Sequence, residues 1–443
     1  MAEREEASGK YAYATLLTRP SYLAGALLLA CTLHKHSPST PLVILYTPET
    51  LPESSIQAVR AEAKYSNIIL HPVDHLRLTT SSTGGKDDIG EMVAERFIDT
   101  WTKLRVFELH ELEYEYVCFL DADMMIFSDP SPPIFNDANF SYLAGEGGGE
   151  ARLMATHVCV CNLDHDSWAP SSWTPANCAY NRLSKSSAPP PVTHKEGAED
   201  KHDDTKGIFN SGTFLFRNLK SIRDFVFSEF DSMGVTKLRS MKFPDQDFLN
   251  AVFTGRWSSL PWSVNALKTW RYWHDNIWDD EKVAVLHYIV DKPWAKRVGE
   301  DGKAGYRGDD GETHSWWWNE YERWVVERQE QREMELVGTT SQFVASADGQ
   351  ENEEMRAIGG GAQNFAKKWE GEEEGELPGA KDHQDDNDED AEKQTYGEGS
   401  HGPILRKPML GERGHGPVVR RGARGRGAFG SALAGRGRGL MDP

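Results

Sequence analysis

Two aspartates follow directly after an apolar run at residues 116–120, YVCFL. They are Asp121 and Asp123, one residue apart. In open α/β sheets a ligand binds outside the carboxyl ends of the strands, so two acids at a strand end are placed to meet a ligand. Their carboxylates can converge on one hard divalent cation that also holds a diphosphate. The pair therefore indicates a metal-assisted transferase that uses a nucleotide-sugar.

The same acid-x-acid spacing recurs at 164–166, at 245–247 and within 386–390. None of these copies follows a strand-like block, and solvated acids in a loop explain such copies equally well. The copy at 121–123 is therefore the candidate, and other segments must support it.

A histidine and a lysine after a second apolar run offer such support. Residues 282–286, KVAVL, predict a short buried strand, and His287 lies at its carboxyl end, as the aspartates lie at the end of theirs. Imidazole is a common metal ligand. Lys292, five residues further on, can pair with phosphate oxygens. A lone histidine is more often structural, so both interpretations stay open on this segment alone.

Two further polar segments stand where elements begin. The segment 207–216, GIFNSGTFLF, predicts a tight turn into a strand, and its glycine lets backbone approach a ligand. A plain turn is an equally good interpretation. A helix is predicted to start at Pro244, which puts Asp245 and Gln246 in its first turn. There the helix dipole stabilises an acid, and this alone explains Asp245.

Strands and helices are predicted to alternate ahead of these segments. Strands are expected at 11–17, 42–46 and 67–73, with helices at 18–36 and 52–65 between them. Such alternation indicates βαβ units and a mostly parallel sheet. The first strand-to-helix turn has no G-x-G-x-x-G, which disfavours a dinucleotide cofactor.

One more helix is expected at 95–111, leading into the strand before the aspartates. Phe97, Trp101 and Leu104 share one apolar stripe of this helix, and Lys103 lies off the stripe. From 257 to 294 the chain is dense in aromatic residues, most of which are assigned to packing.

Composition bounds the class of protein. The 443 residues carry a net charge of -20, which argues against general nucleic-acid affinity for the whole chain. Five cysteines, two of them inside apolar segments, indicate free thiols in a reducing compartment. The longest apolar run, 22–33, is too short to span a bilayer. A cytoplasmic protein without a membrane segment is expected.

The cysteines also raise the question of zinc. His157, Cys159, Cys161 and Cys178 together offer four ligands of the types that zinc takes, but their spacing matches no standard zinc site. Free thiols are therefore the preferred interpretation.

The composition changes abruptly near residue 330. Residues 1–330 are predicted to form one domain, with a mobile surface insertion at about 184–207, and 331–443 to form a disordered tail. The tail is acidic over 351–398 and rich in arginine and glycine over 413–441. Arg-Gly repeats resemble flexible segments that bind RNA, so the tail is a candidate for RNA contact.

Taken together, the segments resemble the retaining glycosyltransferases of family eight, the group that contains glycogenin and galactinol synthase. The resemblance covers residues 11–297. The segments DQDFLN and KLR are more similar to galactinol synthase than to glycogenin. The matching segments are ATLLTRPSYLAGAL from residue 14, WTKLR from 101, FLDAD from 119, FNSGTFLF from 209, DQDFLN from 245 and LHYIVDKPW from 286.

This resemblance implies an α/β GT-A fold with a Rossmann-like mixed sheet, a Mn²⁺ ion and a UDP-sugar donor, UDP-glucose or UDP-galactose. The acceptor would be a small polyol such as inositol, or a glycan. It also assigns roles by position. The metal would be ligated by Asp121, Asp123 and His287, and the nucleotide would be contacted by Leu16, Thr18, Tyr22 and Ala122. The sugar or ribose would contact Asn210 and Ser211, the donor phosphates or sugar would contact Lys103, and the departing diphosphate would contact Lys292. The anomeric carbon would lie beside Asp245 and Gln246.

Three positions depart from the family pattern. Arg19 stands where glycogenin has asparagine, Val290 replaces a glycine common between the histidine and the lysine, and Arg96 is close to, but not at, the spacing of an arginine before Lys103. They affect the expected donor more than the metal site. Whether retention proceeds through a covalent intermediate or by attack on the same face stays open.

Other functions are also compatible with single features. Phosphatases of the haloacid dehalogenase type place D-x-D after a first buried strand, but Met124 and Met125 follow here instead of small polar residues. A non-catalytic scaffold with an RNA-binding tail is the other alternative. Within the transferase interpretation, Tyr272 is a candidate for self-glycosylation.

Overall fold

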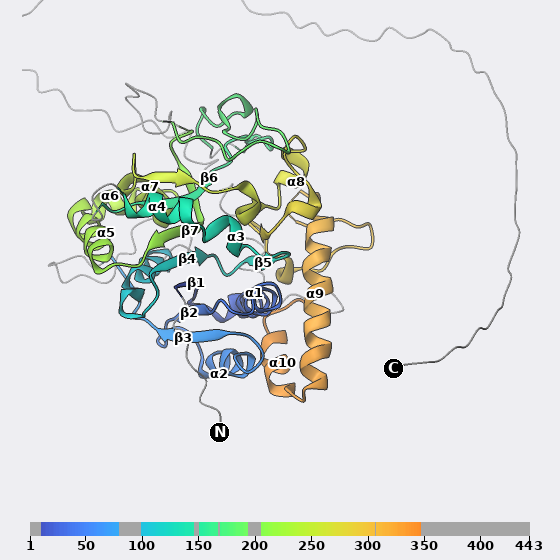
Figure 1. Cartoon of the computed structure of the whole chain (residues 1–443). Coiled ribbons are helices and arrows are strands. Elements are labelled where there is room, and N and C mark those ends of the chain that lie inside the picture. Colours follow the sequence, from blue (N-terminus) through green and yellow to red (C-terminus); the bar gives the residue numbers. More distant parts are fainter. Residues whose placement is uncertain are drawn as a thin grey trace, which may run out of the picture. The chain divides into compact units, whose positions relative to one another are not determined.

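The computed structural model describes residues 10–78, 99–145, 150–166, 169–193, 205–305 and 307–346 (Figure 1). These residues lie within one compact unit, Met1–Pro378. Several sequence predictions fall outside the described residues. They concern Arg96, Phe97, the middle of the insertion at 194–204, and both tail segments, 351–398 and 413–441.

Strands and helices alternate at the start of the chain as predicted. β1 (Tyr11–Leu17), β2 (Leu42–Tyr46) and β3 (Ile68–Pro72) are parallel neighbours. α1 (Leu23–His36) connects the first two, and α2 (Glu53–Glu62) the next two. The apolar blocks of β1 and β2 favour strands because both of their faces are covered.

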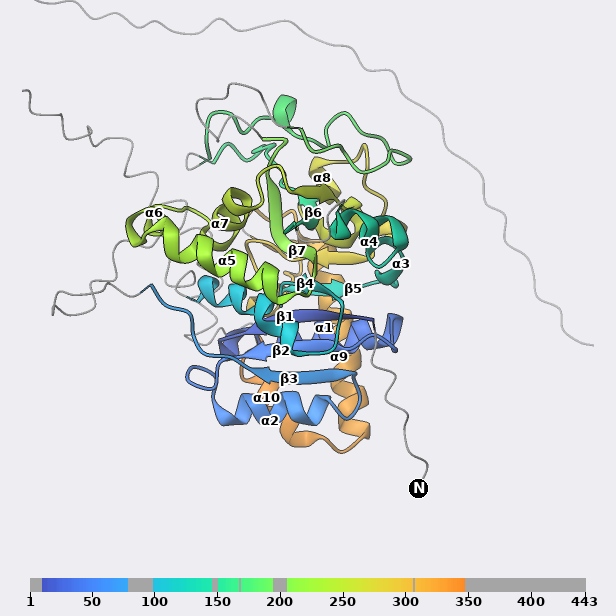
Figure 2. The same ribbon diagram turned by 60° about the vertical axis from the view of Figure 1, so that its left-hand side comes forward.

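These strands continue into a mixed sheet in the order β3-β2-β1-β4-β7-β6-β8 (Figure 2). β4 (Tyr116–Leu120) is parallel to β1, and β7 (Phe209–Arg217) is antiparallel to β4. β6 (Leu153–His157) lies between β7 and β8 (Trp257–Ser259). The predicted α/β class with a mixed sheet is confirmed. Sequence analysis missed β6, because its surroundings show no periodicity.

A smaller sheet brings distant parts of the chain to the end of β4. It has the order β5-β10-β9, with β5 (Met124–Ile126), β10 (Val285–His287) and β9 (Ala266–Leu267). β5 starts directly after the second aspartate and pairs with β10 in antiparallel register, so that Met124 lies opposite His287. This register places the histidine beside the aspartate pair.

Two apolar layers cover the faces of the main sheet. Alternate residues of β4 point to opposite layers: Cys118 packs in the layer that contains α1, and Phe119 in the layer with Trp101 and Phe248. All five residues of β4 are buried, as expected for a strand covered on both faces. Most tryptophans of the aromatic-rich segments are also buried, including Trp270 and Trp294, which confirms their assignment to packing.

The predicted helix at 95–111 is a 3-10 helix, η3 (Thr100–Glu111), in the described residues. The predicted strand at 282–286 is shifted, because residues 280–282 form a 3-10 turn and the strand includes His287. The other elements are η1 (Pro20–Tyr22), α3 (Ser131–Ile134), α4 (Asp137–Ala144), η4 (Pro175–Asn177), α5 (Lys220–Met233), α6 (Val235–Arg239), α7 (Pro244–Val252), η6 (Trp262–Asn265), α8 (Trp270–Trp273), η7 (Asp280–Lys282) and η8 (Pro293–Ala295).

The expected end of the folded part at residue 330 is wrong. α9 (Gly311–Glu330) is followed by α10 (Met334–Ser341), which packs against α2 (Figures 1 and 2). Leu336 is buried, and the chain continues in contact with the core to Ala345, whose N–H donates to the carbonyl of Trp294. The polar composition of this stretch predicted disorder, because the apolar face of α10 is too short to change the composition. None of the described helices is long and apolar enough to cross a bilayer.

Candidate functional site

The two aspartates lie in a turn that backbone contacts hold from both sides. The N–H of Asp121 donates to the carbonyl of Gly212 (2.9 Å), and the N–H of Tyr288 donates to the carbonyl of Asp123 (2.9 Å). Below the turn, α1 comes so close that a Cβ on Gly25 would lie 2.4 Å from the carbonyl oxygen of Ala122. A glycine at this position of the helix therefore permits the turn to sit against α1.

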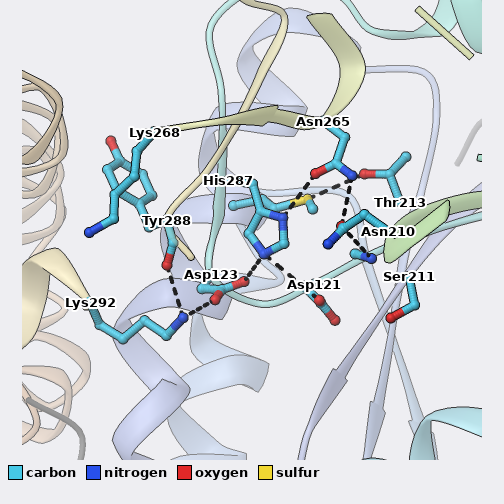
Figure 3. Close-up of polar contacts among 12 residues, drawn as sticks. Asp121, Asp123, Asn210, Ser211, Thr213, Asn265, Lys268, His287, Tyr288 and Lys292 are labelled. Atoms are coloured by element: carbon cyan, nitrogen blue, oxygen red, sulfur yellow. Dashed lines mark hydrogen bonds and ion pairs between the residues drawn. The ribbon is translucent and has the colours of Figure 1, made fainter. Parts of the chain in front are cut away.

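The imidazole of His287 faces both carboxylates (Figure 3). Its Nε2 lies 3.2 Å from Oδ1 of Asp123 and 3.9 Å from Oδ2 of Asp121. One ligand atom from each of these three residues lies within 4.8 Å of the others. The side chain of Asp121 is 27% exposed, whereas Asp123 and His287 are buried, so the group opens to solvent on the side of Asp121.

A chain of hydrogen bonds sets the tautomer of His287. The backbone N–H of Gly212 donates to Oδ1 of Asn210, which identifies this atom as oxygen. Nδ2 of Asn265 donates to the same Oδ1 (2.9 Å) and to Oγ1 of Thr156 (2.7 Å), so that Oδ1 of Asn265 remains as the acceptor. Nδ1 of His287, 2.9 Å from this oxygen, therefore carries the proton.

That tautomer leaves a lone pair on Nε2 of His287, directed at Oδ1 of Asp123. The carboxylate oxygen is buried and has no hydrogen-bond partner among the described residues. In the neutral imidazole these two lone pairs lie 3.2 Å apart and repel each other unless a proton or a metal ion lies between them. Two carboxylates and a correctly protonated imidazole fit a divalent cation, because each offers it an unshared electron pair.

Lys292 completes the surroundings of Asp123. Its Nζ contacts Oδ2 of Asp123 and donates to the carbonyl of Tyr288 (2.9 Å). Burial raises the pKa of Asp123, but the ammonium of Lys292 opposes burial and helps to hold the pKa below its usual range. Asp123 is thus kept ionised.

A second cation, Lys103, joins Asp121 to Asp245. Its Nζ lies 2.9 Å from Oδ1 of Asp121 and 2.6 Å from Oδ2 of Asp245. Burial lowers the pKa of Lys103, yet the two carboxylates raise it above its usual value. Burial raises the pKa of Asp121. The ammonium of Lys103 opposes this increase, and the negative charge of Asp123 adds to it. Asp245 lies in the first turn of α7 as predicted, and its carboxylate also accepts from Oγ of Ser211 (2.9 Å).

The amide of Gln246 connects α7 to the first residues of β7. The predicted tight turn at Asn-Ser-Gly is wrong, because Asn210, Ser211 and Gly212 are part of this strand. Its Oε1 accepts from Nδ2 of Asn210 (3.2 Å) and from the backbone N–H of Ser211 (3.4 Å). A Cβ on Gly212 would lie 2.4 Å from Cε1 of His287. This glycine of β7 therefore makes room for the imidazole.

The fold thus brings together most of the predicted site residues from five segments of the chain. Asp121, Asp123 and Asp245 carry three negative charges against the two positive charges of Lys103 and Lys292, which leaves one carboxylate in excess. An excess negative charge at a site open on one side attracts a divalent cation.

Three residues predicted for the nucleotide, Leu16, Thr18 and Tyr22, lie at the first strand-to-helix turn, apart from this network. The fourth, Ala122, lies between Asp121 and Asp123. Oγ1 of Thr18 donates to Oδ2 of Asp99 (3.3 Å), and Arg19 pairs with the same carboxylate. The ring of Tyr22 packs edge-on against Trp294. Leu16, near the end of β1, is half-buried against the layer of Trp101. Of the three residues at this turn, only Tyr22 approaches the network, with Nζ of Lys292 6.0 Å from its ring centre.

Sequence analysis missed two residues that order the site. Asn265 is fully buried and sets the tautomer of His287, but a single polar residue in the apolar stretch WSVNAL has no recognisable spacing. Asp99 holds Arg19, Thr18 and His75, whose Nε2 lies 2.7 Å from Oδ1 of Asp99. No local pattern indicates either role.

Val290, one of the departures from the family pattern, has a positive φ of 64°. This conformation favours glycine and is rarely adopted by β-branched residues. The backbone between His287 and Lys292 therefore has the form that a glycine suits, and Val290 holds it with local strain. Tyr272 lies elsewhere, with its hydroxyl 3.4 Å from Oδ1 of Asp310, and its self-glycosylation stays a prediction.

Known proteins resemble this chain in sequence. The sequence profile described as Glycosyl transferase family 8 matches residues 15–297. Galactinol synthase 6 of Arabidopsis thaliana is 26% identical over 326 residues, which cover 71% of this chain and 81% of the relative. Galactinol synthase 4 of the same plant is 24% identical over 319 residues, which cover 71% of this chain and 82% of the relative.

Solved structures were compared as well. The galactosyltransferase LgtC in complex with donor and acceptor sugar analogs has 17% sequence identity and a TM-score of 0.42. The alignment covers 69% of this chain and 94% of LgtC.

Proposed function

The chain belongs to glycosyltransferase family 8, and from this membership we propose that it transfers a hexose from a UDP-sugar to a hydroxyl acceptor, with metal dependence and retention of configuration. The observation that carries the proposal is the convergence of Asp121, Asp123 and His287, with the lone pair of the imidazole directed at a buried carboxylate oxygen that lacks a hydrogen-bond partner.

The three residues would hold a divalent cation, which we propose to be Mn²⁺. Carboxylate and imidazole ligands suit this ion. When bound, the ion would neutralise the negative charge of the donor's diphosphate. Lys292 would add a positive charge at the same oxygens, because its Nζ already lies beside Asp123. A diphosphate arriving there replaces part of the lysine's contact with the carboxylate.

Asp245 and Gln246 would lie beside the anomeric carbon of the donor. The carbon becomes positively charged as its bond to phosphate breaks, and a carboxylate at this position stabilises that charge. Lys103 holds the carboxylate of Asp245 in place at 2.6 Å and would also contact the donor phosphates or sugar. Asn210 and Ser211 would contact the sugar or ribose hydroxyls, since both are already oriented by α7.

The nucleotide would occupy the first strand-to-helix turn, with Leu16, Thr18, Tyr22 and Ala122 as contacts. The position of Tyr22 beside Lys292 supports this proposal, because it connects the turn to the residues around Asp123. Thr18 would have to exchange its contact with Asp99 for one with the nucleotide.

The curated relatives are named galactinol synthases, which favours a galactosyl donor and a small polyol such as inositol as the acceptor. UDP-glucose as donor and a glycan as acceptor remain the alternatives to test. We also propose a cytoplasmic location, which the five unpaired cysteines support. Contact of the Arg-Gly tail with RNA stays a prediction.

A panel of UDP-sugars and acceptors, assayed with and without Mn²⁺, tests the function. Asp123→Ala should lower metal-dependent transfer by at least about 100-fold, since it removes a ligand that no neighbour replaces. The matched control is Asp164→Ala, which removes the first acid of another acid-x-acid pair. Unchanged transfer in Asp123→Ala, or uptake of UDP that is independent of manganese in calorimetry, would contradict the proposal.

A further inference from the structure

Three cysteines and a histidine meet in the part of the molecule between β6 and α8. Nε2 of His274 lies 3.2 Å from Sγ of Cys159, 3.4 Å from Sγ of Cys161 and 3.7 Å from Sγ of Cys178. One ligand atom from each of the four residues lies within 4.8 Å of all the others. All four side chains are buried, His274 completely.

Hydrogen bonds alone do not explain this arrangement. A ring nitrogen has either one proton or one lone pair, so Nε2 of His274 can make one good hydrogen bond, whereas three sulfurs surround it. Thiols are weak donors and acceptors that gain little from mutual contact. Three sulfurs and one nitrogen at nearly equal distances are instead the vertices expected around a shared central ion.

The distances agree with a tetrahedral zinc site. With Zn–S bonds of about 2.3 Å and a Zn–N bond of about 2.05 Å, a tetrahedral angle separates sulfur from nitrogen by about 3.6 Å. The observed separations of 3.2, 3.4 and 3.7 Å lie close to this value. Cys₃His is one of the usual ligand sets of structural zinc, and it differs in kind from the oxygen-rich group around Asp123.

The four ligands come from segments that have few other means of holding together. Cys159 and Cys161 follow β6, Cys178 ends η4, and His274 ends α8. Among the described residues between β6 and β7, η4 is the one regular element. A metal that joins these segments would replace the apolar core that such a short, irregular stretch lacks.

The ring of His274 is already oriented for this role. It packs edge-on against Trp270, with ring centres 5.7 Å apart, and against Tyr180 at 6.0 Å. Both aromatic residues are fully buried. His157, the histidine that sequence analysis grouped with the cysteines, is not a member of the cluster, because its Nδ1 lies 3.0 Å from Oγ of Ser259 in the adjacent strand β8.

We propose that Cys159, Cys161, Cys178 and His274 bind one structural zinc ion, which fastens the segment between β6 and β7 to the turn after α8. Binding releases the thiol protons to solvent and closes the coordination sphere with four protein ligands, so the ion has no open position for catalysis. The same turn is connected through β9 to Asn265, which orders His287, so the ion also stabilises the wall of the proposed transferase site.

We expect about one zinc ion per chain in the full-length protein, measured by inductively coupled plasma mass spectrometry. The protein is purified under reducing conditions and without a metal-affinity step. This zinc should remain after dialysis against a mild chelator. Expression with cobalt should give the visible absorption of tetrahedral Co²⁺ and the near-ultraviolet charge-transfer band of thiolate ligands. Protein that is free of zinc and takes up no cobalt would overturn the proposal.

Matched variants identify the ligands. His274→Gln should lower zinc affinity by at least about 10-fold, while His157→Gln, a buried histidine nearby, should keep the metal. Asp123→Ala should also keep it, which separates this ion from any metal at the transferase site. If His274→Gln does not fold, the zinc content and cobalt spectrum of the unmodified protein decide. A disulfide between two of the three cysteines, found by peptide mass spectrometry after alkylation, would also contradict the proposal.

Discussion

The protonation of His287 depends on residues that never touch the proposed metal. The backbone N–H of Gly212 orients Asn210, Asn210 orients Asn265, and Oδ1 of Asn265 accepts a hydrogen bond from Nδ1–H of His287. Each hydrogen bond leaves only one assignment for the next. A buried amide that makes all of its hydrogen bonds in this way specifies a single arrangement of the site.

Replacing this amide should weaken the metal site without removing a ligand. In Asn265→Ala the imidazole loses the acceptor for Nδ1, so we expect the manganese concentration for half-maximal transfer to rise about 10- to 100-fold. The control is Asn218→Ala, a buried amide that donates to the carbonyls of Leu109 and Tyr114. Both variants should lose comparable stability, and an unchanged manganese dependence in Asn265→Ala would contradict the assigned role.

A second residue-scale prediction concerns pH. Burial, together with the neighbouring Lys268 and Lys292, holds the pKa of His314 well below its usual value of 6.5. Below that value the unfolded chain binds a proton that the folded chain does not, so the free energy of unfolding falls as the pH falls. The contribution is at most about 1.4 kcal/mol per pH unit.

His314→Gln tests this contribution, because an amide oxygen can still accept from Lys268, whose Nζ lies 3.3 Å from Nε2 of His314. Urea unfolding at several pH values below 6.5 should show a smaller loss of stability in the variant than in the unmodified protein. Equal slopes in the two proteins would show that His314 does not contribute.

At the scale of elements, two close contacts position the site. α1 approaches the aspartate turn at Gly25, and β7 approaches the imidazole of His287 at Gly212. Between them, the antiparallel pair of β5 and β10 sets the register of the histidine. The geometry of the site is therefore a consequence of how helices and strands pack, and small changes in that packing should reach it.

Gly25→Ala should displace the aspartate turn from α1. The added Cβ would lie 2.4 Å from the carbonyl oxygen of Ala122 and 2.6 Å from Cη2 of Trp294, so we expect a loss of about 1–3 kcal/mol in the free energy of unfolding and a clear loss of transfer. Gly338→Ala is the control, because its Cβ would meet nothing within 4 Å in α10. It should gain up to about 1 kcal/mol. Normal transfer in Gly25→Ala would argue against this packing requirement.

For the whole molecule, α9 and α10 bind the C-terminal end of the described chain to its first half. Nη2 of Arg328 lies 2.6 Å from Oε1 of Glu62 in α2, and both side chains are buried. Nε1 of Trp324 donates to the other oxygen of the same carboxylate (3.0 Å). A buried ion pair of this kind is costly to break from one side, which makes α9 part of the folded unit. α10 joins the same unit by packing against α2.

Two truncations test this boundary. A chain that ends at residue 346 should keep transfer and stability, because every proposed site residue precedes that point. A chain that ends at residue 330 also loses Leu336 and Val337 from the core and should be destabilised by roughly 3 kcal/mol or more. Urea unfolding and transfer assays check both. Equal stability of the two chains would show that the folded domain ends at residue 330. RNA retention by the chain that ends at residue 346, compared with retention by the full chain, tests whether the tail binds RNA.

The sequence by itself determined the alternating strands and helices of the first half, the buried strand before Asp121 and the family to which the chain belongs. These features follow from local periodicity and from short motifs, which neighbouring residues specify. Tertiary structure alone decided that Asn265 orients His287, that His274 and not His157 joins the cysteines, and that α10 completes the core. Those contacts join residues far apart in the chain, and their register depends on sheet pairing and packing that no local pattern encodes.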